Sequence, residues 1–154
     1  MFFTDDLQIE IIDVFLIDRK SSKYTTPKRP FHILTKRIAG YCDMSFGNDV
    51  YKANESNLLY IPANTEYRRT SYDDETIVAI HFNIANRSFQ SPILIDVDKE
   101  KCDNAFLQIF YTWSEKKIGY RYKCAAILYD YLSSIIIQDL TQRNIARLKS
   151  LLNT

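Results

Sequence analysis

The sequence predicts a mainly β domain that ends in α-helices, and three observations lead to this fold class. Short apolar runs separated by turn residues fill the first two thirds of the chain. The last third has helical periodicity with hardly any glycine or proline, and the composition changes near Asp98. Strands spaced by roughly ten residues favour a compact barrel or sandwich over a parallel sheet. A chain of 154 residues is long enough to form one domain with its own core.

The first strand is predicted at residues 9–17, where the sequence IEIIDVFLI is almost continuously apolar. A polar, charged connection follows at residues 18–28 and contains Pro27. Apolar residues then mark a second strand at 31–38.

A hairpin is predicted next. Gly40 separates the second strand from a third at residues 41–46, and the turn Gly47-Asn48-Asp49 leads into a fourth at 50–53. Glycine and asparagine are typical of the tight turns that join two antiparallel strands. We therefore expect these two strands to pair.

Four further strands are predicted, at residues 58–61, 66–71, 76–84 and 93–97. Pro62 marks the turn after the first of them, because proline cannot donate a hydrogen bond to a ladder. Residues 76–84 (TIVAIHFNI) form the longest β-like run, and their near-continuous apolarity predicts a strand buried on both faces.

Two helices are predicted after the strands, at residues 103–117 and from 121 to about 140. Gly119 is expected to end the first of them. The apolar stripe of the first helix consists of Phe106, Ile109, Phe110 and Trp113. The broader stripe of the second consists of Cys124, Ile127, Leu128, Tyr131, Leu132, Ile135 and Ile136.

The second helix carries more apolar surface than one neighbouring barrel needs. Ala125, Tyr129, Ile137 and Leu140 extend its hydrophobic residues beyond one stripe. We expect this second face to pair with another subunit, with the alternative that the first helix covers it. The residues predicted at the dimer interface are Tyr129, Leu132, Ile136 and Ile137.

The bulk composition excludes several classes of function. A formal net charge of +1 and a pI near 7.7 supply no basic field for nucleic acid, so this chain is not expected to bind DNA by itself. No apolar run approaches the ~18 residues that span a bilayer, which predicts a soluble protein. Cys42, Cys102 and Cys124 are an odd number without CxxC spacing and with no secretory segment before them, as expected of buried apolar residues in a reducing cytoplasm.

Catalytic and metal-binding motifs are not found in the sequence. The two histidines, His32 and His81, are fewer than a metal site on a barrel normally requires, and no nucleophile motif or phosphate-binding glycine loop is present. We therefore expect no catalytic residue, no metal and no cofactor. His81 is interpreted as a hydrogen-bonded core histidine rather than a ligand contact.

Five features in order give the chain a resemblance to a known family. They are Arg29-Pro30, Gly40, the hairpin at 46–48, the segment LLYIPANT at 58–65 and Ile80-His81-Phe82. Their order and spacing are similar to those of the N-terminal cupin barrel of AraC-type transcription regulators. The resemblance implies a cupin-like, double-stranded β-helix barrel followed by two α-helices.

The resemblance continues into the helical part and covers nearly the whole chain. Residues 113–122 (WSEKKIGYRY) and 125–129 look like the linker and dimerisation helices of the family. The implied organisation is a ligand-binding barrel at 1–98, linker and dimerisation helices at 99–140, and the start of a linker at 141–154. The linker would lead to a helix-turn-helix domain outside this sequence, through which alone DNA would be bound.

In this family a small molecule, often a sugar, occupies the barrel and changes how the dimer presents its DNA-binding domains. The resemblance implies that the residues of this sequence in contact with the ligand are Arg29, His32, Tyr67, Arg69, Val78 and Ile80. Val78 and Ile80 stand where sugar-binding relatives have polar and aromatic residues, which weakens the case for a pentose-like ligand.

Arg29 and Arg69 suggest a partly anionic ligand, because a guanidinium presents paired donors to a carboxylate or phosphate. Alternatively, Arg29 pairs with a carboxylate to fix the N-terminal arm and Arg69 is solvated.

The function predicted from the sequence is therefore an effector-sensing and dimerising domain, not an enzyme, that binds a sugar or sugar-derived acid in the cytoplasm. Two alternatives stay open. One is a small cupin-type sugar isomerase or other cupin enzyme. The other is an interaction protein whose barrel is filled by its own side chains, which the 14% aromatic content permits.

Overall fold

A computed structural model describes the whole chain except residues 1–3, 5 and 154. The side chains of residues 138–140 also lie outside the described part, including Leu140 of the predicted second face. The strands are β1 (Ile9–Arg19), β2 (Ser22–Thr26), β3 (His32–Ala39), β4 (Cys42–Phe46), β5 (Asp49–Ala53), β6 (Asn57–Ile61), β7 (Tyr67–Ser71), β8 (Glu75–Ile84) and β9 (Ile93–Asp96). The helices are α1 (Lys99–Glu115) and α2 (Tyr120–Leu152).

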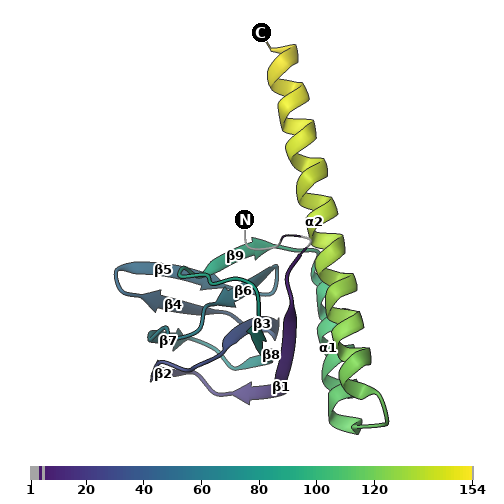
Figure 1. The fold of residues 1–154 in the computed structure, drawn as a ribbon. Helices are drawn as coiled ribbons and strands as arrows, with labels where there is room; N and C mark the ends of the chain where they lie inside the picture. Colours follow the sequence, from purple (N-terminus) through teal and green to yellow (C-terminus); the bar gives the residue numbers. More distant parts are fainter. Residues whose placement is uncertain (1–3, 5, 154) are drawn as a thin grey trace.

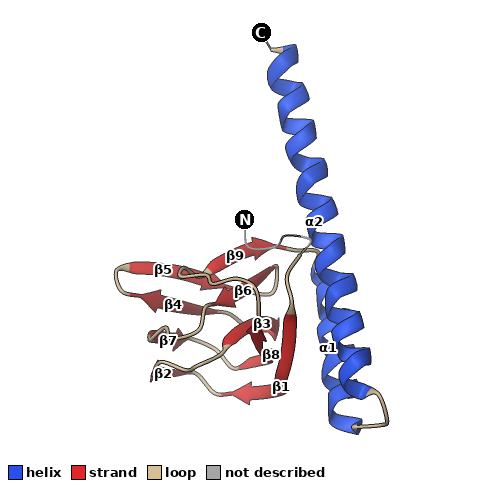
Figure 2. Ribbon diagram, in the orientation of Figure 1, coloured by secondary structure: helices blue, strands red, loops and turns tan. Residues whose placement is uncertain are grey.

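The strands form two antiparallel sheets that face each other, with the helices beside the larger sheet (Figures 1 and 2). The five-stranded sheet has the order β1-β8-β3-β6-β9, and the four-stranded sheet has the order β2-β7-β4-β5. The predicted fold class is confirmed: the chain is mainly β, with a cupin-like pair of sheets followed by two helices.

The molecule has three layers, namely the smaller sheet, the larger sheet and the helices, with an apolar core between each neighbouring pair. The larger core lies between the five-stranded sheet and the helices, where residues such as Val78 and Phe82 of β8 meet Phe106 of α1 and Leu128 of α2. The smaller core lies between the two sheets and includes Ile33 of β3. The five-stranded sheet is therefore covered on both faces.

This double burial explains the pattern of β8, the longest predicted strand. β8 lies between β1 and β3, and its buried residues point alternately to the two cores. Ala79 belongs to the inner core and Ile80 to the helix-facing core. The prediction of a strand buried on both faces is confirmed.

The predicted hairpin is also confirmed. β4 and β5 pair antiparallel, and Phe46 faces Asp49 across a two-residue turn formed by Gly47 and Asn48. Gly47 has φ 62°, the left-handed conformation that this turn requires and that glycine adopts without strain.

One strand was not predicted. β2 lies in the segment that the sequence analysis assigned as a polar connection, and it pairs with β7 at the edge of the smaller sheet. Its residues are exposed except for Thr26, so it has no apolar alternation that a sequence pattern could detect. Its position is determined by pairing with β7.

The helix boundaries differ from those predicted. Asp98 caps α1, because its side chain accepts a hydrogen bond from the backbone N–H of Lys101 at 3.0 Å. The helix ends at Glu115, before the left-handed residue Lys116, so the prediction that Gly119 ends it was wrong. Gly119 instead precedes the first turn of α2.

α2 is longer than predicted and continues to Leu152. Residues 120–152 contain neither proline nor glycine, so nothing in the sequence interrupts the helix after residue 140. Its second half extends beyond the sheets and away from them (Figure 1). No described helix is both long enough and apolar enough to cross a membrane.

Candidate ligand-binding cavity

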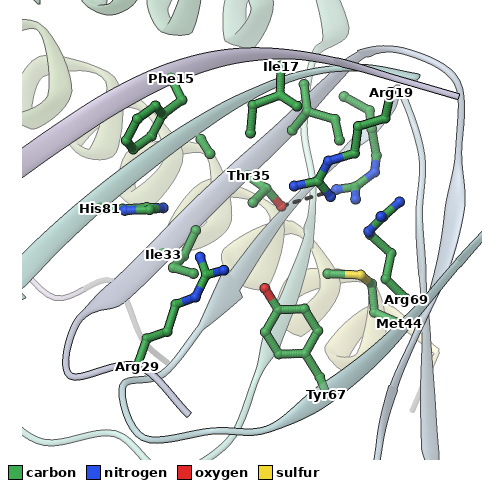
Figure 3. Close-up of a pocket in the computed structure, with 13 residues that line it drawn as sticks. Phe15, Ile17, Arg19, Arg29, Ile33, Thr35, Met44, Tyr67, Arg69 and His81 are labelled. Atoms are coloured by element: carbon green, nitrogen blue, oxygen red, sulfur yellow. Dashed lines mark hydrogen bonds between the residues drawn. The ribbon is translucent and has the colours of Figure 1, made fainter. Parts of the chain in front are cut away.

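A cavity of about 230 Å³ lies between the two sheets, inside the barrel (Figure 3). Its apolar lining consists of Phe15, Ile17, Ile33, Met44, Ile77 and Ala79. Its polar lining consists of Arg19, Arg29, Thr35, Arg37, Tyr67, Arg69 and His81. The volume is slightly below the ~300–1,000 Å³ typical of pockets for drug-sized ligands, so the cavity suits a small molecule.

Four arginines line this cavity, and no aspartate or glutamate is among the lining residues. Arg37 is held firmly by three hydrogen bonds: its Nε donates to Glu75 at 2.9 Å, its Nη1 to Thr35 at 3.1 Å and its Nη2 to the sulfur of Cys42 at 2.9 Å. Both Arg37 and Glu75 are 2% exposed. Arg37 and Glu75 therefore form a buried, fixed ion pair behind the cavity wall.

Arg69 is held more loosely than Arg37. Its Nη1 lies 3.4 Å from the second oxygen of Glu75 and 3.3 Å from Ser71, and its Nη2 lies 3.2 Å from Ser22. The residue is only 5% exposed, yet its buried Nε has no hydrogen-bond partner in the described part of the chain. A buried donor without an acceptor costs free energy that a bound ligand can recover.

The positive charges at this end of the cavity are crowded. Burial, and then the charge of Arg69, lower the pKa of Arg19 from its usual value. In the described part, Glu75 is the carboxylate that pairs with cavity arginines, through Arg37 and Arg69. Four arginines against one carboxylate leave three formal positive charges, which a bound anion would compensate.

The other end of the cavity combines an arginine with aromatic rings. The imidazole of His81 stacks on Phe31 with a centroid distance of 4.4 Å and lies 5.0 Å from the ring of Phe15. Burial, and then the charge of Arg29, lower the pKa of His81 to about 4, so this histidine is neutral at pH 7. Figure 3 shows Arg29 on the His81 side of the cavity, across from Arg19 and Arg69.

The structure brings three of the six predicted ligand contacts together. Arg29, Tyr67 and Arg69 line the cavity. The alternative of a solvated Arg69 is contradicted, because its side chain is buried.

Val78 and Ile80 do not reach the cavity. They point into the helix-facing core, whereas Ile77, Ala79 and His81 of the same strand line the cavity. The predicted positions are shifted by one residue, and in a strand such a shift moves a side chain to the opposite face.

His32 does not line the cavity either. Its Nδ1 accepts a hydrogen bond from the backbone N–H of Ala63 at 3.2 Å and lies 2.7 Å from the hydroxyl of Tyr60. Its ring also stacks on that of Tyr60. These contacts give His32 the role expected of His81, a hydrogen-bonded histidine of the core, while His81 lines the cavity.

Arg19, Arg37 and His81 also line the cavity, and none of the three was predicted from the sequence to do so. Arg19 is the last residue of β1 and Arg37 lies inside β3, and in both places a charged residue usually faces solvent. Side chains alternate along a strand, so placing His81 in the cavity would also have placed Ile77 and Ala79 there. Because β8 is apolar on both faces, its sequence does not show which face is the inner one. In the described part, no three His, Cys, Asp or Glu side chains are grouped so that they could hold a metal ion.

The four residues predicted at a dimer interface gather around one surface groove. This groove of about 420 Å³ lies between the N-terminal segment and α2, and it is lined by Thr4, Leu7, Tyr129, Leu132, Ser133, Ile136 and Ile137. Leu132 is buried and Ile137 is exposed. The hydroxyl of Tyr129 accepts a hydrogen bond from the backbone N–H of Ile9 at 2.6 Å, which ties β1 to the helix.

Comparison with known proteins identifies similar structures but no similar sequence. No protein-family model matches the chain, and no curated protein matches it. A crystal structure of an apo ToxT variant from Vibrio cholerae has a TM-score of 0.60 at 13% identity, over 90% of this chain and 57% of that one. Wild-type ToxT from Vibrio cholerae bound to an unsaturated fatty acid has a TM-score of 0.53 at 14% identity, over 83% of this chain and 55% of that one.

The similarity is one of fold. A third structure, ToxT from Vibrio cholerae bound to a methylnaphthalenyl butenoic acid, has a TM-score of 0.51 at 14% identity, over 86% of this chain and 57% of that one. The chain therefore spans just over half the length of the ToxT structures that it resembles. The shared part includes helical residues as well as the sheets, because it covers more than four fifths of this chain and the strands end at Asp96.

Proposed function

We propose that this chain is the effector-sensing and dimerising domain of an AraC-type transcription regulator, and that it acts by binding a small molecule rather than by catalysis. The observation that carries the proposal is the cavity between the sheets, with its surplus of arginines. The sequence features shared with AraC-type regulators and the fold shared with ToxT support it.

The proposed effector carries a carboxylate and an apolar body. The surplus positive charge and the unpartnered Nε of Arg69 favour an anion. Six apolar side chains line the cavity, and Thr35 and Tyr67 supply its hydroxyls, which is a poor environment for the many hydroxyls of a neutral sugar. An organic acid, including a sugar acid with few free hydroxyls, satisfies both parts of the cavity. The ToxT structures bound to a fatty acid and to a butenoic acid support this choice, because both ligands are carboxylic acids.

We further propose that α2 pairs with α2 of a second copy. Ile137, Ile145, Leu148 and Leu152 are exposed, the last two at 55% and 85%. At 3.6 residues per turn they lie within about 80° of one another, which makes one apolar stripe. This stripe begins at the surface groove and follows a helix segment that extends away from the sheets (Figure 1). An isolated helix of that length is only marginally stable in water, so a second copy that buries the stripe would stabilise it.

Ligand binding tests the first part of the proposal. Thermal unfolding would be followed with matched probes, octanoate against octanol and adipate against hexane-1,6-diol. We expect at least one acid to raise the melting temperature and its neutral counterpart to have no effect. Failure of both acids to stabilise the protein would contradict the proposal.

Two neighbouring arginines of β7 provide a matched pair of variants. Arg69 points into the cavity, and Arg68 is exposed on the outer face. Arg69→Gln is expected to abolish the stabilisation by the acid, whereas Arg68→Gln is expected to retain it. An equal loss in both variants would mean that the acid acts by general screening of charge, and the proposed site would be wrong.

A further inference from the structure

The arginines of the cavity form two groups rather than one. Arg19, Arg37 and Arg69 gather where the carboxylate of Glu75 lies, and Arg29 stands apart beside His81 (Figure 3). The two groups lie at opposite ends of the wall that β3 and β8 form, with Arg37 at one end and His81, beside Arg29, at the other. His81 of β8 pairs with Ile33 of β3, and Ile77 pairs with Arg37.

The length of β3 sets the separation between the two groups. Ile33 and Arg37 are four residues apart, so the two ends of the cavity wall are separated by about 13 Å at ~3.3 Å per residue. Arginine side chains reach inward from both ends, so the distance between the groups that would bind a ligand is shorter. The wall between them is mostly apolar, with Ile33, Ile77 and Ala79 facing inward.

Each group has donor capacity that the described part of the chain does not use. At the Glu75 end, the Nε of the buried Arg69 has no acceptor. At the other end, no hydrogen bond or ion pair is found for the guanidinium of Arg29 among the described residues, although its backbone is fixed. The carbonyl oxygen of Arg29 accepts a hydrogen bond from the backbone N–H of Asn64 at 2.7 Å.

We infer that the cavity takes a ligand with an anionic group at each end and an apolar spacer between them, of the class of the α,ω-dicarboxylates. One carboxylate binds Arg69 and Arg19, and the other binds Arg29 beside the neutral His81. This inference rests on the proposed effector-binding function and specifies the ligand class of the same cavity. It differs from a fatty acid or any other monocarboxylate, which would leave Arg29 without a counter-ion.

The charge of the site supports two carboxylates over one. Glu75 neutralises one of the four cavity arginines, and a monocarboxylate would neutralise one more. A dicarboxylate reaches two further arginines and brings the charge of the cavity close to balance. The free-energy cost of removing charged groups from water is smaller when each group has a counter-ion.

Calorimetric titration with matched ligands tests the inference on the full chain. The probes are adipate, pimelate and suberate, each compared with its own monomethyl ester, which has the same chain but one charge fewer. We expect the best diacid to bind on the order of tenfold more tightly than its ester, because hydrogen bonds to charged groups contribute more than neutral ones. An ester that binds as tightly as its diacid would overturn the inference and leave the effector-binding proposal standing.

Arg29→Gln separates the two ends of the ligand. This variant is expected to bind the diacid only as tightly as the wild-type protein binds the ester, while its affinity for the ester stays unchanged. Lys28→Gln is the control, because Lys28 is the exposed neighbour on the same loop. If Arg29→Gln keeps the full preference for the diacid, the assignment of the second carboxylate to Arg29 is wrong. If no diacid, ester or monocarboxylate binds the wild-type protein, both this inference and the proposed function fall.

Discussion

The ammonium of Lys36 lies 2.7 Å from the carboxylate of Asp103, and this ion pair joins the central sheet to α1. Lys36 is completely buried and also donates to the carbonyl oxygens of Arg37 and Glu55. The next residue of β3, Arg37, points to the opposite face and binds Glu75 beside the cavity. Consecutive residues of one strand therefore connect the cavity wall with the helices.

This ion pair gives the first prediction. Asp103→Ala should destabilise the protein by about 3 kcal/mol or more, because it leaves the buried ammonium of Lys36 without its counter-ion. Lys36→Met should cost less, since Asp103 keeps Lys99 as a partner and the methionine fills the same space. Urea unfolding measures both. The prediction fails if Lys36→Met proves the more damaging of the two.

The second prediction concerns Glu75, the carboxylate shared by two cavity arginines. Glu75→Gln should lower the free energy of unfolding by roughly 3 kcal/mol, because it leaves the buried Arg37 unpaired. Added organic acid should restore more stability to this variant than to the wild-type protein, since it now supplies the missing negative charge. Glu66→Gln, at an exposed position, is the control in the same unfolding experiment. A variant that acids do not rescue would contradict the charge balance argued for the cavity.

The third prediction concerns a close contact at Gly40. This residue has φ +91°, and a Cβ atom there would lie 2.7 Å from the carbonyl oxygen of Asp74. Gly40→Ala should cost about 1–3 kcal/mol of stability through backbone strain, with the steric clash in addition. Gly47→Ala has the same sign of φ, but no atom lies within 4 Å of the added Cβ, so its cost should be smaller. Equal costs for the two variants in urea unfolding would show that the clash does not matter.

The fourth prediction is a pH dependence that arises from His81. Burial and Arg29 lower the pKa of His81 from 6.5 to about 4 in the folded protein, so the unfolded chain takes up its proton at a higher pH. The contribution of His81 to stability is therefore fully present above pH 6.5 and is lost as the pH falls from 6.5 towards 4. His81→Gln should flatten the curve of unfolding free energy against pH within this window. Burial also lowers the pKa of His32, so the variant should retain a smaller slope of the same sign. An unchanged slope in His81→Gln would exclude the assignment.

The fifth prediction tests the pairing of α2. Leu148→Glu places a charge in the exposed apolar stripe and should shift sedimentation from dimer to monomer at the same concentration. Ser150→Glu adds the same charge on the opposite side of the helix and should leave the dimer intact. A wild-type protein that sediments as a monomer at high concentration would rule out the dimer.

Local sequence signals were sufficient for much of the fold. Turn glycines located the hairpin of β4 and β5, and apolar runs located β1 and β8. Helical spacing identified the stripes of both helices, and all the residues of the first stripe belong to the core or pack against it. Arg29, Tyr67 and Arg69 were identified through the family resemblance, and all three line the cavity.

Other features gave no local signal that a sequence pattern could detect. β2 is a strand because β7 lies beside it, and the edge of a sheet needs no apolar side chains. α2 continues past residue 140 because nothing interrupts it, and a missing signal could not show where the helix would end.

The sequence by itself determined the division into strands and helices and the presence of a core, because these depend on the spacing of apolar residues along the chain. Only the tertiary structure decided which side chains of β8 point into the barrel. The sequence of an apolar strand between two cores does not show which face is the inner one. The pairing of β8 with β1 and β3 places His81 inside the barrel and Val78 and Ile80 beneath the helices. The same packing buried Lys36 and Arg37, two charged neighbours whose burial is possible because carboxylates from distant parts of the chain meet them.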